Sequence, residues 1–401
     1  MGKKSVSAAF SLLLLTSALW SGGWNNTLMG IRALGIGAAF VGIADDPSAI
    51  FYNPAGLILQ EQRLNFSISG IYIMPTHEYS MNGVMATSHE NTSIPQFFFT
   101  YKASERMTLG FGAYTPYATG GMNWQREQLG TPLKSYLGII SFTPSLSYRF
   151  SEQFSFGLNL NIYYSMLEIN TENETGSPLK TKESGTSVSA SFGLMYQPNE
   201  KWRLGLSVRG PATVTLSGTT SINENVPGFG TVQLDRDSET KFKLPWDIEF
   251  GISYSISERI LLSASAQYSM WSRLDKVDKS IKNVPFVGDV FVQEVLNFSN
   301  IFILRAGVEY RIPAGVFLRG GLGMDRAAQP ADTLTPVNID TDKFTLLGGI
   351  GYRTGNTQID FVYILANGRE REKTSTDFGF PIQERYNLSA SILGLGVTFA
   401  F

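Results

Sequence analysis

The chain has 401 residues, of which 16% are charged and 12% aromatic, with 40 Gly and no Cys. The lack of cysteine excludes a disulfide scaffold, a thiolate metal site and a cysteine nucleophile, and a net charge of -2 provides no general attraction to nucleic acid. A mean hydropathy of -0.02 argues against a helical membrane protein, whereas few charges with many aromatics and glycines indicate strands that are apolar on one face.

The first 23 residues have the features of a secretory signal peptide. Lys3 and Lys4 precede a mostly apolar run over 8–20, and the small residues Ser21, Gly22 and Gly23 come after it. This run is too short to span a membrane as a helix. We therefore expect 1–23 to be removed and the mature protein to be exported by a bacterium that has a periplasm.

Residues 24–62 form a second segment, which lacks the alternation seen later in the chain. The segment is rich in glycine and aliphatic residues, and short helical or irregular pieces are expected at 31–34 and 38–41. A flexible tail would be polar and poor in aromatics, but this segment carries Phe40, Phe51 and Tyr52. We predict a compact hatch domain over 24–62 that plugs the lumen formed by residues 63–401.

Residues 63–401 alternate between apolar and polar side chains in about fourteen runs. In 154–166, apolar side chains fill the even positions and mostly small or polar ones fill the odd positions, which gives a strand two different faces. Many runs reach 10 residues, about the length that a tilted strand needs to cross a bilayer. A soluble β-sandwich or propeller, the alternative, has shorter strands.

The connections between these runs also alternate, between short turns and long polar links. The predicted long links are 76–91, 117–135, 170–184, 218–239, 272–298, 327–341 and 368–385. Short turns at one rim and long loops at the other are typical of an outer-membrane barrel. The predicted fold is all-β: a 14-stranded antiparallel transmembrane β-barrel over 63–401, located in the outer membrane, with an N-terminal hatch plugging the lumen.

Charged residues of both signs share the inward parity of neighbouring predicted strands. They include Arg203, Arg209, Asp247, Glu249, Arg305, Glu309, Arg319, Asp325 and Asp360. Charges inside a barrel commonly pair with one another and with a plug, so we expect an ion-pair network. The alternative is an unpaired arginine that binds the carboxylate of an acidic ligand.

The sequence offers little support for catalysis or for a cofactor. Its two histidines, His77 and His89, lie in the first predicted loop without a recognisable partner arrangement. No phosphate-binding loop is present. We predict no enzyme activity, no catalytic residue, no metal site and no cofactor; a barrel hydrolase using either histidine and a surface adhesin acting through the long loops are less favoured hypotheses.

Residues 37–57 resemble the hatch segment of the FadL/TodX family of outer-membrane transporters for long-chain fatty acids and other hydrophobic compounds. The Asn53-Pro54-Ala55 triplet matches the family's motif, and residues 114–124 are similar to its segment after the third strand. The resemblance implies hatch or gating roles for Gly37, Phe40, Asp45, Asp46, Asn53, Pro54 and Ala55.

The resemblance also implies how such a protein would work. It implies passive, gated uptake of long-chain fatty acids or aromatic hydrocarbons, with lateral diffusion through a gap in the barrel wall at the third strand. Gly110, Gly112 and Pro116 lie on this strand, where glycine weakens pairing and proline removes a donor. An ordinary strand end explains these three residues equally well.

The expected partners are a hydrophobic small molecule, outer-membrane lipid and lipopolysaccharide, and the barrel-assembly machinery through the C-terminal Phe401, but no nucleic acid. We expect a monomer. The sequence departs from the family in its polar links 170–184 and 218–239, where well-known members carry apolar helical elements. The alternative function is a general porin for small polar solutes.

Overall fold

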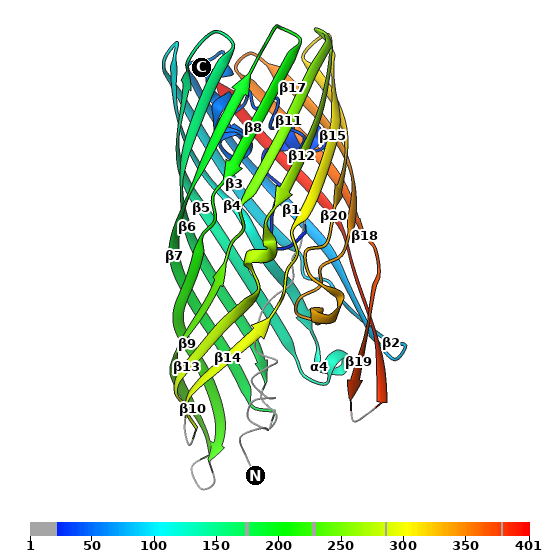
Figure 1. Ribbon diagram of the computed structural model, residues 1–401. Helices are drawn as coiled ribbons and strands as arrows, with labels where there is room; N and C mark the ends of the chain where they lie inside the picture. The colour runs from blue at the N-terminus through cyan, green and yellow to red at the C-terminus, as the bar shows by residue number, and fades with distance from the viewer. Residues whose placement is uncertain (1–21, 173–175, 227–229, 285–286, 378–379) are drawn as a thin grey trace.

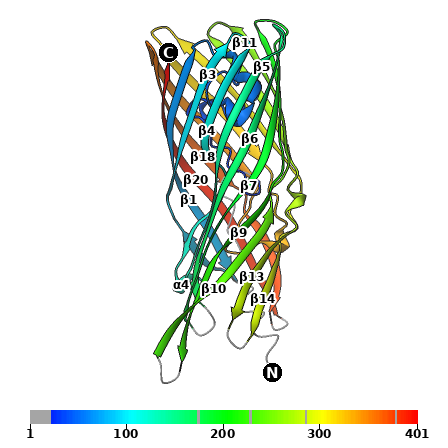
Figure 2. The same ribbon diagram turned by 90° about the vertical axis from the view of Figure 1, so that its left-hand side faces the viewer.

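The computed structural model describes residues 22–401 except 173–175, 227–229, 285–286 and 378–379. The described strands form one antiparallel sheet that closes into a 14-stranded barrel (Figure 1, Figure 2). Closure occurs where the first strand pairs with the last over a long register, from Asn65–Ala400 to Met81–Glu384. Closure removes the free edges that a sheet cannot expose to lipid.

Six of the fourteen wall strands are each interrupted once, which gives twenty strand segments. In chain order the wall consists of β1 (Leu64–Met81), β2 (Val84–Ser88) with β3 (Thr92–Ser104), β4 (Met107–Trp124), β5 (Leu133–Arg149), β6 (Phe154–Glu172), β7 (Pro178–Tyr196), β8 (Trp202–Arg209) with β9 (Thr213–Val226), β10 (Gly230–Lys243) with β11 (Asp247–Ser257), β12 (Ile260–Ser269) with β13 (Lys276–Val284), β14 (Gly288–Val295) with β15 (Ile301–Ile312), β16 (Val316–Asp325), β17 (Lys343–Thr354), β18 (Thr357–Gly368) with β19 (Arg371–Asp377), and β20 (Phe380–Ala400).

The two faces of each strand match the alternation in the sequence. On β6, Leu158 and Leu160 are exposed on the outer surface, whereas Asn159 and Asn161 are buried on the inner one. The outer surface is therefore apolar where lipid would surround it, and polar side chains face the lumen.

The two rims of the barrel differ as expected. Short turns and the C-terminus lie at one rim, at the top of Figure 1, and long hairpins extend from the other. The prediction that these long links are loops was wrong for most of them, because strand pairing continues into the hairpins. Within 170–184, for example, β6 and β7 stay paired as far as Glu172 and Pro178, and β9 and β10 pair through most of 218–239.

Three of the predicted long links, 117–135, 272–298 and 327–341, hold all or part of a short helix. The link 117–135 begins as strand and then holds α4 (Arg126–Leu129), and the link 327–341 holds η3 (Ala331–Thr333). A further short helix, η2 (Trp271–Arg273), separates β12 from β13. In the described part of the chain, no helix has the length and apolarity needed to cross a membrane as a helix.

The residues before β1 lie within the ring of strands, and we call 22–62 the inner segment. It contains α2 (Ile31–Gly35), α3 (Ala49–Tyr52) and η1 (Pro54–Leu59), seen in blue within the upper half of the barrel in Figure 1. Of the short helical or irregular pieces expected here, 31–34 lies in the helix α2 and 38–41 is irregular, with turns at its two ends. Most of the side chains of the inner segment are buried.

Candidate functional site

The backbone of the inner segment lies directly against the backbone of the wall at several glycines. A Cβ atom added to Gly321 of β16 would lie 2.2 Å from the Cα of Gly37, and one added to Gly307 of β15 would lie 2.2 Å from the carbonyl oxygen of Ile36. Gly37 itself has a φ of 71°, which favours glycine. Any side chain at these inward wall positions would displace the inner segment.

The Asn53-Pro54-Ala55 triplet attaches the inner segment to β5, β6 and β7. The Asn53 amide donates to the carbonyl oxygens of Val41 (3.1 Å) and Leu194 of β7 (3.0 Å), and its Oδ1 accepts from the backbone N–H of Ala55. The hydroxyls of Ser147 and Ser155 donate to the Ala55 carbonyl. The triplet is therefore a hydrogen-bonded anchor rather than a solvent-exposed loop.

A chain of ion pairs joins the inner segment to four wall strands. Arg32 contacts Asp45 at 2.5 Å and Glu309 at 3.0 Å, and Arg203 contacts Asp45 at 2.9 Å. Arg319 then links Glu309 (2.8 Å) to Asp360 (2.7 Å).

The carboxylates of the inner segment respond differently to burial. Burial raises the pKa of Asp45, but the guanidinium groups of Arg32 and Arg203 outweigh burial and hold this pKa well below its usual range. Burial raises the pKa of Asp46, although Arg32 and hydrogen bonds from Ser48 partly oppose the shift.

Phe40 of the inner segment packs against the ring of Tyr52, with ring centroids 5.4 Å apart.

Three smaller groups hold the remaining inward charges that the sequence singled out. Arg305 pairs with Asp325 at 2.5 Å. Asp247 accepts from Gln267 (3.0 Å) and lies 3.4 Å from the guanidinium of Arg209. The hydroxyl of Ser265 donates to Glu249. All of the inward arginines predicted from parity thus have a carboxylate neighbour.

The wall loses its ladder between β3 and β4. Pairing of these strands runs from Ser104–Met107 to Phe97–Ala113 and then stops, although β4 continues to Trp124. On its other side β4 pairs with β5 through two irregularities, between Tyr114 and Tyr117 and between Gly120 and Met122. The second half of β4 is therefore separated from β3.

Gly110, Gly112 and Pro116, which the sequence associated with a break in the wall, do not all lie at the break. Gly110 and Gly112 lie in the paired part of β4, and a Cβ on either would lie within about 3 Å of a neighbouring side chain, including Ile50 of the inner segment. They make room for the inner segment. Pro116 lies inside the first irregularity.

The start of the inner segment takes the place of the missing strand partner. Asn25 forms an antiparallel bridge with Tyr117, the backbone N–H of Asn26 donates to the Pro116 carbonyl (2.8 Å), and the N–H of Ala118 donates to the Trp24 carbonyl (3.2 Å). The Asn26 side chain donates to the Thr115 carbonyl at 2.7 Å.

The same stretch is attached to the β3 margin of the break through the side chain of Gln96. Its Oε1 accepts from the Gly30 N–H at 2.9 Å, and its Nε2 donates to the Leu28 carbonyl. Residues 24–30, which we call the bar, therefore cross the break and bond to both of its margins. Gln96, Asn25 and Asn26 were not singled out from the sequence, where the one signal was a polar Gln96 between inward apolar neighbours.

A mainly apolar cavity of about 370 Å³ occupies the break, and we call this cavity the gap. Its lining includes Ile94, Pro95 and Phe97 from β3 and Ala113 and Ala118 from β4. Behind it, on the lumen side, aromatic rings cluster around the bar.

The aromatic cluster centres on Trp24. Its ring packs edge-to-face on Phe242 at 5.1 Å and on Phe298 at 6.1 Å, and Trp271 lies 6.2 Å away. Tyr117 of β4 extends the cluster to Trp271 at 6.3 Å. An apolar, aromatic surface thus leads from the lumen to the gap, with the bar between them.

The histidines lie away from this arrangement. His77 is buried on β1, whereas His89 is exposed and lies within hydrogen-bond distance of Thr76. Within the described ranges, no group of three or more His, Asp or Glu side chains is placed to hold a metal ion.

Comparisons with known proteins identify relatives along the whole chain. A family model described as "Outer membrane protein transport protein (OMPP1/FadL/TodX)" matches residues 12–401. Outer membrane protein P1 of Haemophilus influenzae is 23% identical over 90% of both chains. The long-chain fatty acid transport protein of an Escherichia coli O6:H1 strain is 22% identical over 86% of both. The crystal structure of a Pseudomonas aeruginosa FadL homologue superposes with a TM-score of 0.81 at 17% identity, covering 95% of this chain and 100% of that one.

Proposed function

Since the chain belongs to the FadL/TodX family of outer-membrane transport proteins, we propose that it mediates passive, gated uptake of hydrophobic compounds, which leave sideways through the gap between β3 and β4. The observation that carries this proposal is the bar: one short stretch of the inner segment bonds to both margins of an apolar break in the wall. The family consists of transport proteins of the outer membrane, not enzymes.

In this proposal the inner segment is a hatch with a fixed part and a moving part. The Asn53 triplet and the ion pairs of Arg32 hold the fixed part on the wall. The bar is the moving part, because it carries no charged side chain and so makes no ion pair, and only hydrogen bonds and apolar side chains such as Trp24, Leu28 and Met29 hold it. Displacing Trp24 from its aromatic neighbours would free the bar and join the lumen to the gap.

The chemistry of the gap supports an apolar cargo. Leaving sideways takes a molecule from the lumen directly into the hydrocarbon of the membrane, which favours solutes that are mainly apolar and makes a charged group costly to carry. A long hydrocarbon chain is the substrate class that we favour. Relatives named as long-chain fatty acid transport proteins support this choice.

The direct test fills the gap with a larger side chain on β4, a wall strand that borders it. Ala113 faces outward and lines the gap, so Ala113→Trp fills it without altering the inner segment. We expect the initial uptake of labelled palmitic acid by reconstituted protein to fall about tenfold, the effect of about 1.4 kcal/mol on a barrier. Ala264→Trp makes the same change on the opposite wall, also facing outward, and should leave uptake unchanged.

Unchanged uptake in Ala113→Trp would contradict lateral exit. A general porin, the alternative, predicts a large and steady conductance in planar bilayers for the wild-type protein. We expect a low conductance instead, because the inner segment fills the lumen with buried side chains.

Two assembly roles accompany this function as proposals. The C-terminal Phe401 is 57% exposed at the end of β20, where the barrel-assembly machinery would recognise it. The protein would act as a monomer, with lipid and lipopolysaccharide around its apolar outer face.

A further inference from the structure

A second apolar depression lies on the outer face of the wall, beside the gap. It has a volume of about 490 Å³ and is bounded by side chains from β1, β3, β18 and β20, namely Tyr72, Pro95, Phe361, Leu393 and Leu395. Gly70 forms its floor, because a Cβ atom on Gly70 would meet nothing within 4 Å. Leu395 (58%) and Phe361 (41%) are among its exposed side chains, so the depression opens toward the membrane. We call it the exit groove.

The exit groove is continuous with the gap. Ser93, Ile94 and Pro95 line both cavities. The gap cavity also reaches outward over β3 to Ile68 of β1, and Gly70 is the next outward-facing residue on that strand. Pro95 lies opposite Gly70 in the β1–β3 register, and so it is the ridge between the two cavities.

The backbone at this ridge suits contact with hydrocarbon. Pro95 has no backbone N–H, so β3 carries one donor fewer where it borders the gap. On its other side the floor is closed, because Gly70 pairs with both Pro95 and Leu395. An apolar molecule that passes over Pro95 therefore meets a paired, apolar floor rather than an open sheet edge.

We propose that a hydrocarbon chain leaving the gap moves over Pro95 into the exit groove, which holds it against the outer wall before it mixes with bulk lipid. This inference rests on the proposed function, because it needs a cargo that arrives through the gap. The occupant is the transported chain itself, with unbranched hydrocarbon as the class that such a shallow apolar groove fits.

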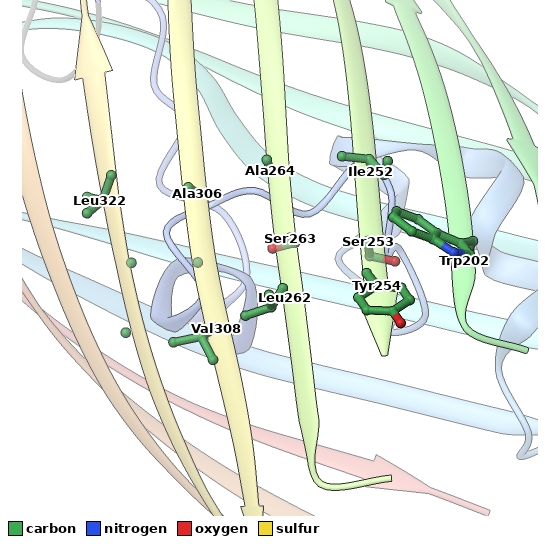
Figure 3. Close-up of a pocket in the computed structure, with 13 residues that line it drawn as sticks. Trp202, Ile252, Ser253, Tyr254, Leu262, Ser263, Ala264, Ala306, Val308 and Leu322 are labelled. Carbon is green, nitrogen blue, oxygen red and sulfur yellow. The ribbon is translucent and has the colours of Figure 1, made fainter. Parts of the chain in front are cut away.

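A groove on the opposite side of the barrel provides the contrast (Figure 3). It has a volume of about 520 Å³ and is lined by outward side chains that include Trp202, Tyr254, Leu262, Val308 and Leu322, over small residues such as Ala264, Ala306 and Gly320. The strands that form it, β8, β11, β12, β15 and β16, stay paired at the residues that line it. It shares no lining residue with the gap, so a molecule can reach it only from the surrounding membrane.

The two grooves allow a matched pair of substitutions. Gly70→Leu fills the exit groove, and Gly320→Leu fills the opposite groove, where the added Cβ would meet only Val308 at 4.0 Å. Both side chains would point outward from paired strands, and the heat-dependent gel mobility of each variant reports whether the barrel has formed. We expect uptake of labelled palmitic acid to fall about tenfold in Gly70→Leu and to stay at the wild-type rate in Gly320→Leu.

The Ala113→Trp variant separates failure of this inference from failure of the proposed function. If Ala113→Trp loses uptake while Gly70→Leu keeps it, the exit groove is refuted and lateral exit stands. If neither variant loses uptake, lateral exit itself is refuted. Equal losses in Gly70→Leu and Gly320→Leu would mean a general effect of the outer surface and would also overturn the groove.

A second measurement needs no substitution in the groove. A photoreactive palmitic acid is added to the long-hairpin side of reconstituted protein and illuminated early during uptake, and the labelled residues are mapped by mass spectrometry. We expect labels on Tyr72 and Phe361, few on Trp202 and Tyr254, and loss of the former in Ala113→Trp. Equal labelling of both grooves, or labelling that survives Ala113→Trp, would mean that the probe comes from the bilayer and would overturn the inference.

Discussion

Asn53 carries much of the attachment of the inner segment in a single side chain. Its amide reaches Val41 within the segment and Leu194 on the wall, while its oxygen caps the N–H of Ala55. Since Asn53 is fully buried, removing its side chain leaves the carbonyl oxygens of Val41 and Leu194 without this donor and the Ala55 N–H without its acceptor. Each group left unsatisfied costs about 1–3 kcal/mol.

Asn53→Ala should therefore loosen the inner segment while the barrel stays folded. We expect faster hydrogen–deuterium exchange for the backbone amides of 37–57 and unchanged exchange in wall strands far from it. Asn199→Ala is the control, because Asn199 caps two N–H groups in an exposed turn. Protection of 37–57 equal to that of the wild type would contradict the anchoring role.

The lowered pKa of Asp45 determines how the attachment of the inner segment to the wall depends on pH. A carboxylate whose pKa is lowered in the folded protein stabilises it fully above the ordinary pKa, and this contribution is lost only as the pH falls through the lowered value. Bilayer conductance of the wild-type protein should thus stay low from neutral pH down to about pH 4.

Asp45→Asn removes the ion-pair partner of Arg203 and one of the carboxylate partners of Arg32. The bilayer conductance of this variant at neutral pH should therefore exceed that of the wild-type protein. Identical conductance of the two proteins across this range would show that the Asp45 ion pairs do not hold the inner segment.

Single residues also mark what the sequence could and could not predict about the site. Parity placed Arg305 and Arg319 on the inner face, but their partners Asp325 and Glu309 depend on height along the barrel, which parity does not give. The bonds of the bar to Pro116 and Thr115 involve backbone groups, and nothing in the residue types announces them.

At the scale of elements, two adjacent glycines of β16 differ in whether they contact the inner segment. Gly321 faces inward against Gly37, whereas Gly320 faces outward, where a Cβ atom would meet only Val308 at 4.0 Å. Gly321→Ala should displace the inner segment, and Gly320→Ala should not.

We expect Gly321→Ala to raise bilayer conductance and to lower the midpoint of thermal release of the inner segment, measured by accessibility of a single cysteine introduced at Ala49. The chain has no cysteine of its own, so the label reports one site. Equal accessibility in the two glycine variants would argue against close backbone packing.

The elements also explain where the prediction of strands succeeded and where it ended. Apolar alternation predicted β6 from its first residues, since one face meets lipid. Beyond the membrane both faces of a hairpin meet water or polar neighbours, so the apolar signal fades while backbone pairing continues into 170–184. The turn at Asn82-Gly83, where both residues have positive φ, is a hairpin signal that we did not use.

For the whole molecule, the sequence predicted the barrel, its rims and its family, because these depend on strand length, parity and the Asn53 motif. For the gap, the sequence predicted only the strand on which it lies, the third. The gap exists because the first half of β4 pairs with β3 whereas its second half bonds to the bar. These bonds join parts of the chain that are about ninety residues apart.

The central claim is that the bar must leave the gap during uptake, and a reversible lock tests it most directly. Asn25 and Tyr117 face each other across an antiparallel bridge, where Cα atoms lie roughly 4.5–5.5 Å apart, within the range that a disulfide spans. With cysteine at both positions in a chain that has none, we expect the oxidised protein to lose uptake of labelled palmitic acid and the reduced protein to regain it. Equal uptake in the oxidised and reduced forms would contradict the account.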